Sequence, residues 1–267
     1  MTALNVDPRY YQLIVQASLI LWGAFYLESK LPLSHILAGF SVSLMTQVAF
    51  TRYLSLPTNL LSTLNSTLSI LILLHANSWV WIILACFVAI SSKFIIRYNN
   101  KHIFNPSNLG IVAVLLLTSS AWVAPGQWGQ AAWFILLMAG SGLILMMGFS
   151  RMLTSISFLI TFVGITLLRA FWLGDPLPVP LHQLQNGALL IFTFFMLSDP
   201  MTTPSNNISR LIFGIWLAIT SAILLFGFYI PNAFLYALAL SMPLVLLLNH
   251  YFTGRHYHWP REYHYEK

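Results

Sequence analysis

The sequence predicts an all-α polytopic membrane protein with about ten transmembrane helices in one integral membrane domain, residues 1–267. Charged residues make up 7% of the chain and hydrophobic residues 58%. Because a soluble domain carries about 25% charged residues, this composition favours a chain surrounded mostly by lipid. Apolar runs of roughly 17–25 residues, each long enough to span a bilayer, recur from end to end. The predicted helices cover residues 10–27, 33–51, 58–75, 78–96, 106–123, 130–149, 153–173, 183–198, 208–228 and 231–251.

Charged and turn-forming residues set the boundaries of these segments. The first segment runs into Glu28 and Lys30 without a signal-peptide cleavage pattern, so we expect a retained first helix. Segments 106–123 and 208–228 each begin near a proline that follows Asn, Asp or Thr, and segment 183–198 is the shortest. The connections are too short to hold a nucleotide-binding domain. Any soluble cofactor chemistry is therefore expected to come from partner proteins.

The placement of lysine and arginine predicts that both termini are cytoplasmic. With the N-terminus inside, the outer connections hold only Lys30 and Arg169. The other basic residues fall on the inner side: Arg9, Arg52, Lys93, Arg97, Lys101, Arg151, Arg210, Arg255, Arg261 and Lys267. Such an excess is typical of cytoplasmic loops. We expect a protein of the cell inner or plasma membrane with a cytoplasmic tail at 252–267, and its basic balance requires no nucleic-acid partner.

Two predicted inner connections contain polar residues directly before proline. The pairs are Asn105-Pro106, Asp199-Pro200 and Thr203-Pro204. One interpretation is helix capping, because such pairs are strong helix-start signals, with Arg210 as a nearby ion-pair partner for Asp199. The other is a pocket, because helix starts on one membrane face offer free N–H groups and a positive dipole end to a polar or anionic ligand. The residue pattern alone leaves both interpretations open.

Small and hydroxylated side chains gather at the start of segment 58–75, and segment 183–198 opens in a similar way. Such residues allow close helix packing, or they line a wet cavity. Each of the two segments is third in a run of five. This order suggests two inverted five-helix repeats with a site near their interface.

Several classes of site are not expected. The histidines of the apolar segments lie near helix ends, so no bis-histidine haem is predicted, and one cysteine excludes an iron–sulfur cluster held by this chain alone. Nucleophile-elbow, P-loop and dinucleotide fingerprints are missing. No catalytic residue and no metal site is predicted.

Two stretches resemble a known family. "FFMLSDPMTTPSNNISRLIFG" is similar to the signature of the family that contains the D subunit of the Rnf electron-transport complex and the B subunit of the sodium-pumping NADH:quinone oxidoreductase. "HIFNPSNLG" is similar to that family's "N-P-F-N-P-A-x-x-G". The matching residues are Phe104, Asn105, Pro106, Gly110, Phe194, Phe195, Asp199, Pro200, Thr202, Arg210, Leu211, Ile212, Phe213 and Gly214, with Ser198 in place of the usual threonine. We expect the resemblance to cover nearly the whole chain.

The resemblance implies a membrane electron-transfer subunit that works with redox partner proteins, at most one subunit of an oxidoreductase. Members with covalent FMN carry it on a threonine motif between helices 5 and 6, and "TSSAWVAPGQWGQAAW" lacks that motif. We therefore expect a non-covalent flavin (riboflavin or FMN) or a quinone head group on the cytoplasmic side. The expected binding residues are Asn105, Asn108, Asp199, Thr203 and Arg210. A small-solute transporter or channel, and a structural subunit without cofactor, remain the alternatives.

Overall fold

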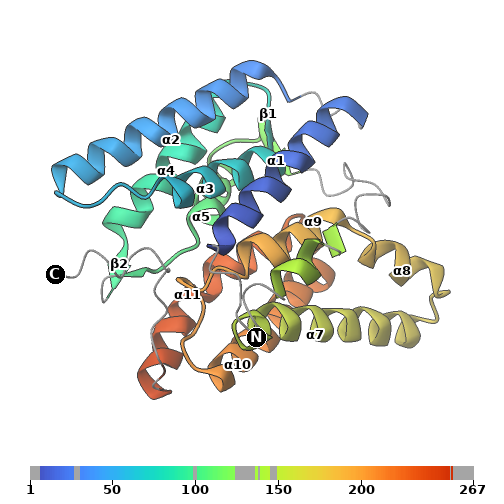
Figure 1. Cartoon of the computed structure of the whole chain (residues 1–267). Coiled ribbons are helices and arrows are strands. Elements are labelled where there is room, and N and C mark those ends of the chain that lie inside the picture. The colour runs from blue at the N-terminus through green and yellow to red at the C-terminus, as the bar shows by residue number, and fades with distance from the viewer. Residues whose placement is uncertain are drawn as a thin grey trace. The chain divides into compact units, whose positions relative to one another are not determined.

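The computed structural model describes residues 7–26, 31–98, 101–123, 136–137, 139–144, 149–252 and 254. These residues divide between two compact units, with 7–123 in the first and 136–254 in the second. Both units consist almost entirely of helices (Figure 1), which confirms the predicted helical class. The division falls between the fifth and sixth predicted segments. The single-domain organisation and the inverted repeat stay predictions.

The first unit is built around one short central helix. Its helices are α1 (Pro8–Tyr26), α2 (Leu33–Tyr53), α3 (Leu60–Leu73), α4 (Trp79–Ile95) and α5 (Pro106–Leu117). Helix α3 packs against each of the other four (Figure 1). Every residue from Ser66 to Leu74 is buried. A helix buried on all sides forms the core of its unit, and the apolar face that meets lipid belongs to its neighbours.

Two predicted transmembrane segments of this unit are helical only in part. Helices α3 and α5 have 14 and 12 residues, which makes them about 21 and 18 Å long, shorter than the roughly 30 Å hydrocarbon layer. After them, β1 (Leu74–Ala76) and β4 (Ala121–Val123) pair in antiparallel fashion. Backbone that leaves a helix at membrane depth must be hydrogen-bonded within the protein. This pairing is the physical reason that segments 58–75 and 106–123 end in strands. A second small pair joins β2 (Arg97–Tyr98) to β3 (Lys101–His102).

The second unit contains longer helices and two π-helical turns. Its elements are α7 (Phe149–Leu173), α8 (Pro178–Leu184), α9 (Gly187–Ile191), η1 (Phe192–Met196), α10 (Asn207–Ala222), η2 (Ile223–Gly227) and α11 (Ala233–Tyr251). The predicted segment 183–198 is wrong in its start, because α8 ends at Leu184 and a new helix begins at Gly187 after the cap Asn186. Most of segment 130–149 lies outside the described residues.

Several helices are suited to a membrane. Among the described residues, four are long and apolar enough to cross one: Leu33–Tyr53, Met152–Leu173, Asn207–Gly227 and Ala233–Tyr251. Shorter apolar helices cover Leu60–Leu73, Trp79–Ile95, Pro106–Leu117 and Gly187–Met196. Ten spans are therefore not confirmed. Large apolar side chains are openly exposed, such as Phe171 at 87% and Trp172 at 88%. Such exposure on α7 fits a surface in contact with lipid.

Two glycines lie where helices cross closely. A Cβ atom at Gly214 on α10 would collide with Ser157 and with the carbonyl oxygen of Thr154 on α7. A Cβ atom at Gly110 on α5 would collide with the carbonyl oxygen of Ala85 on α4. Helix pairs approach this closely only where one partner has no side chain. Both glycines belong to the two motifs that carry the family resemblance.

We predict that Gly214→Ala destabilises the protein by about 1–3 kcal/mol, because the added methyl group forces α7 and α10 apart. The measurement is the thermal unfolding midpoint of the purified protein in detergent. Gly164→Ala on α7 is the matched control, since no described atom lies within 4 Å of its Cβ position. That control should be neutral or stabilising by up to about 1 kcal/mol. Equal midpoints for the two variants would contradict the close crossing.

Candidate functional site

The acidic motif of the second unit folds into a turn that Asp199 itself organises. We call residues Ser198–Asn206 the Asp199 turn. Oδ1 of Asp199 accepts a hydrogen bond from the backbone N–H of Met201 at 3.0 Å. Its main-chain oxygen accepts from the Thr202 N–H at 3.2 Å. An aspartate that bonds the backbone two residues ahead stabilises a turn. The carboxylate is half-buried, and Pro200 beside it is buried.

Asp199 and Thr203 do not cap the following helix, which corrects the capping prediction for both pairs. Helix α10 begins at Asn207, and Oδ1 of Asn206 accepts from the backbone N–H of Ile208 at 2.8 Å. A helix that began at Pro204 would use the Pro204 carbonyl oxygen for the Ile208 N–H. That oxygen instead accepts from Nε of Arg210 at 2.8 Å.

Arg210 is a buried cation that joins the Asp199 turn to α7. Its side chain is 8% exposed. Besides the bond to Pro204, Nη1 donates to the carbonyl oxygen of Ser150 and to Oδ1 of Asn207, each at 3.0 Å. Burying a guanidinium group is costly unless its donors are satisfied, and backbone carbonyls satisfy them here. The ion pair with Asp199 stays a prediction.

Two buried hydroxyl groups near Arg210 have unmet hydrogen-bonding capacity. Oγ of Ser205 and Oγ of Ser209 have no hydrogen-bond partner among the described residues. Ser209 on α10 is 0% exposed, and Thr203 in the Asp199 turn is 5% exposed. Hydroxyl groups both donate and accept, as do the ring edge of a flavin and, in its reduced form, a quinone head group. The donor set around the turn therefore fits a polar head group.

A π-helical turn leads into the Asp199 turn. In η1 the Leu197 N–H bonds to the Phe192 oxygen, five residues back. The Thr193 carbonyl oxygen accepts a hydrogen bond from Oγ of Ser155 on α7 at 2.7 Å. Oγ of Ser198 donates to the Phe194 carbonyl oxygen. Single π turns inside helices are rare and frequently lie at functional sites.

The motif of the first unit caps its helix as predicted. Oδ1 of Asn105 accepts from the Asn108 N–H at 3.1 Å and from Oγ of Ser107 at 2.8 Å, with Pro106 at the first helical position of α5. Asn105 and Asn108 are 4% and 2% exposed. The predicted site residues therefore divide between the units, with Asn105 and Asn108 in the first and Asp199, Thr203 and Arg210 in the second. A pocket shared by both sets stays a prediction.

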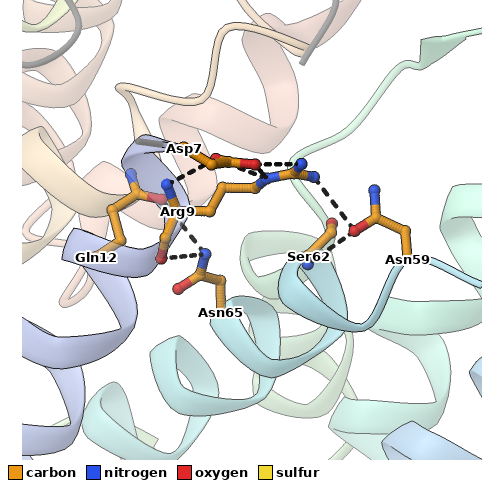
Figure 2. Close-up of polar contacts among 6 residues, drawn as sticks. All are labelled: Asp7, Arg9, Gln12, Asn59, Ser62 and Asn65. Atoms are coloured by element: carbon orange, nitrogen blue, oxygen red, sulfur yellow. Dashed lines mark hydrogen bonds and ion pairs between the residues drawn. The ribbon is translucent and has the colours of Figure 1, made fainter. Parts of the chain in front are cut away.

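The first unit also contains a buried ion pair that was not among the predicted site residues. Nη2 of Arg9 lies 2.6 Å from Oδ2 of Asp7, and their side chains are 4% and 2% exposed. Nη1 of Arg9 donates to Oδ1 of Asn59, the cap of α3, at 3.2 Å (Figure 2). Nδ2 of Asn65 donates to the Arg9 carbonyl oxygen at 3.4 Å. We call Asp7, Arg9, Gln12, Asn59, Ser62 and Asn65 the Arg9 cluster.

The signal for this cluster was available in the chain. Asp7 precedes Pro8, the first residue of α1, and its Oδ1 accepts from the Arg9 N–H at 3.0 Å. This is the same pairing of a capping residue with proline that marked the other two motifs. The hydrogen bond from Arg9 to Asn59 then ties the start of α1 to the start of α3.

Comparison with known proteins finds relatives for the second half of the chain. The NQR2, RnfD, RnfE family matches residues 118–258. The D subunit of the ion-translocating oxidoreductase complex is 32% identical over 148 residues in Citrobacter koseri and in Escherichia coli O7:K1. The protein of the same name in Escherichia coli K12 is 31% identical over 148 residues.

These matches are narrower than the sequence motifs suggested. Each covers 53% of this chain, and the chain spans 38% of the length of each relative. The family match includes the Asp199 turn and Arg210 but excludes Asn105 and Asn108. The comparisons therefore support the resemblance over residues 118–258, and its extension over nearly the whole chain stays a prediction.

We predict that Asp7→Ala destabilises the protein by about 3–5 kcal/mol, because it leaves the buried Arg9 guanidinium without its carboxylate. The double variant Asp7→Leu/Arg9→Met should lose less than Asp7→Ala alone, because it removes both charges. Thermal unfolding in detergent measures both. Asp175→Asn, at a half-buried loop position, is the matched control and should shift stability by no more than about 0.5 kcal/mol. Additive losses in the double variant would contradict the pairing.

Proposed function

The chain belongs to the NQR2, RnfD, RnfE family, and on that premise we propose that it is a membrane electron-transfer subunit working with redox partner proteins. The observation that carries the proposal is that the family match contains the Asp199 turn. The buried cation Arg210 and the buried hydroxyl groups of Ser205 and Ser209 lie at or next to the end of this turn, where α10 begins. The relatives are named as subunits of an ion-translocating oxidoreductase complex. We propose that this chain is likewise a subunit of such a complex.

We propose that the Asp199 turn holds the head group of a non-covalent flavin or a quinone. Arg210 supplies positive charge that stabilises an anionic head group, since its own donors already fix its position. Thr203, Ser205 and Ser209 supply hydroxyl groups for the polar edge of the ring. When bound, a flavin accepts and donates electrons one or two at a time. Asn105 and Asn108 lie in the first unit, and a binding role for them is a separate proposal.

We further propose that the N-terminus, the C-terminus and the Asp199 turn face the cytoplasm. The support is the excess of basic residues on one side of the predicted helices. The polar head group then meets partner proteins on the side where soluble electron donors lie.

We predict that the protein purified from its membrane shows the paired near-ultraviolet and blue absorbance bands of a flavin. Denaturing electrophoresis should leave no fluorescent band at the size of the chain, because the threonine motif for covalent attachment is missing. A fluorescent band that survives denaturation would contradict non-covalent binding. Colourless protein that reduces no quinone would favour the solute-transporter or structural alternatives.

Variants locate the site. Thr203→Val and Asp199→Asn should each weaken flavin or quinone binding about 10- to 150-fold, since a lost hydrogen bond to a charged group costs about 1.5–3 kcal/mol. Thr220→Val and Asp175→Asn are matched controls, because the Thr220 hydroxyl donates to the Trp216 carbonyl oxygen within α10 and Asp175 lies in the loop between α7 and α8. Titration of free riboflavin into stripped protein measures the affinity. If all four variants bind equally, the Asp199 turn is not the site.

We predict the orientation from single cysteines in a Cys86→Ala background. Ile208→Cys, beside the Asp199 turn, should resist a membrane-impermeant maleimide in intact cells and react after lysis. Asn77→Cys, exposed between α3 and α4, should react in intact cells. The reverse pattern would invert the topology and place the Asp199 turn outside.

A further inference from the structure

The interface between α1 and α3 contains amide side chains that form hydrogen bonds across it, one to another amide and one to a hydroxyl group. Nδ2 of Asn65 donates to Oε1 of Gln12 at 3.5 Å, and Nε2 of Gln16 donates to Oγ of Ser69 at 2.9 Å. Gln12, Gln16 and Ser69 are 8%, 3% and 3% exposed. We call these four residues the α1–α3 seam. It lies in the first unit, outside the residues that match the family.

Two acceptor atoms in this seam are left unsatisfied by the protein. Oε1 of Gln16 and Oδ1 of Asn65 are buried and have no hydrogen-bond partner among the described residues. Each unsatisfied buried acceptor costs about 1–3 kcal/mol. Lipid chains offer no hydrogen-bond donor, so the cost remains unless another molecule supplies one.

The polar side chains of the seam are spaced so that they follow one another along both helices. Gln12 and Gln16 are one turn apart on α1, and Asn65 and Ser69 are one turn apart on α3, so each pair lies on one helix face. From Asp7 to Gln16 the chain rises about 13 Å, which is close to half of the roughly 30 Å hydrocarbon layer. The path begins at the Arg9 cluster, whose polar groups include the cap of α3.

The local charge decides what the seam can bind. Asp7 carries one negative charge, while Arg9 and Lys93 carry two positive charges, and Nζ of Lys93 donates to Ser62 of the same cluster at 3.1 Å. A net positive neighbourhood disfavours a metal cation. The unsatisfied atoms are acceptors, so the ligand must be a neutral donor small enough for a helix interface.

We propose that the α1–α3 seam binds water, which donates to Gln16 and Asn65 and forms a hydrated path from the Arg9 cluster to about the middle of α1. Buried waters take two to four polar partners, and the seam supplies side chains for them. Such a path gives solvent, and with it protons, access to the membrane interior. It is independent of the flavin proposal, because it uses no residue of the Asp199 turn.

Thiol accessibility in membrane vesicles tests this path. Ser69→Cys and Gln16→Cys, each in the full chain with Cys86→Ala, are treated with aminoethyl methanethiosulfonate, which reacts with the thiolate that forms in water. Native Cys86, 0% exposed in the core of α4, is the dry control. Ile14→Cys, 66% exposed on α1, controls for contact with lipid.

We expect both seam cysteines to react at least about tenfold faster than Cys86 and Ile14→Cys, because only the seam thiols meet water. Ser69→Cys changes one atom and keeps the proposal testable if Gln16→Cys misfolds. Slow reaction of Ser69→Cys in monodisperse protein would overturn the proposal and leave a dry helix interface. No outcome depends on flavin content, so this test and that of the Asp199 turn fail separately.

Discussion

The structure of the first unit depends on one constraint: polar groups that leave water for the membrane must be bonded inside the protein. The constraint is strongest at α3, because this helix is short, rich in hydroxyl and amide groups and fully buried from Ser66 to its end. Its start is capped by Asn59, which also accepts from Arg9. Its end passes into β1, whose backbone pairs with β4. Helices α1, α2 and α4 thus supply hydrogen bonds to α3 as well as apolar surface.

The same constraint shapes the second unit by other means. The π-helical turn η1 shifts the backbone bonding of the chain, and hydroxyl groups of Ser155 and Ser198 satisfy two of its carbonyl oxygens. Outside η1, Arg210 donates hydrogen bonds to two further carbonyl oxygens, those of Pro204 and Ser150. The Asp199 turn is held by side chains from two elements, because Arg210 on α10 donates to the Pro204 oxygen and Asn249 on α11 accepts from the Ser205 N–H. A loop fixed in this way keeps its polar groups in place for a ligand, which is what a binding site requires.

Hydropathy predicted most of the helices. Arg9 meets Asn59 and Gln16 meets Ser69, so α1 and α3 run in the same direction. Hydropathy could not predict where α3 and α5 stop, because strand pairing between residues far apart in sequence decides it. The cap at Asn105 followed from local chemistry alone.

The start of α10 did not follow from local chemistry, because three capping candidates compete within eight residues and contacts made at a distance select one. Oδ1 of Asn249 on α11 accepts from the Ser205 N–H at 2.9 Å, and Arg210 takes the Pro204 carbonyl oxygen. Asn206 is then the first residue able to cap. The ion pair between Asp7 and Arg9 was missed for a different reason. Its burial depends on contact with the start of α3. Arg9 bonds there to the cap residue Asn59, which is fifty residues further along the chain.

The arginine and the glycine of the second motif have one structural role in common. Arg210 and Gly214 lie one turn apart on α10, and they meet Ser150 and Thr154, one turn apart on α7. Gly110 likewise meets Ala85 and Ala89, one turn apart on α4. These residues fix how the helices cross. Their presence in a sequence therefore indicates the fold more directly than it indicates a bound ligand. The residues that would distinguish a ligand site are those the packing does not use, and around the start of α10 these are Ser205 and Ser209, whose hydroxyl groups have no hydrogen-bond partner among the described residues.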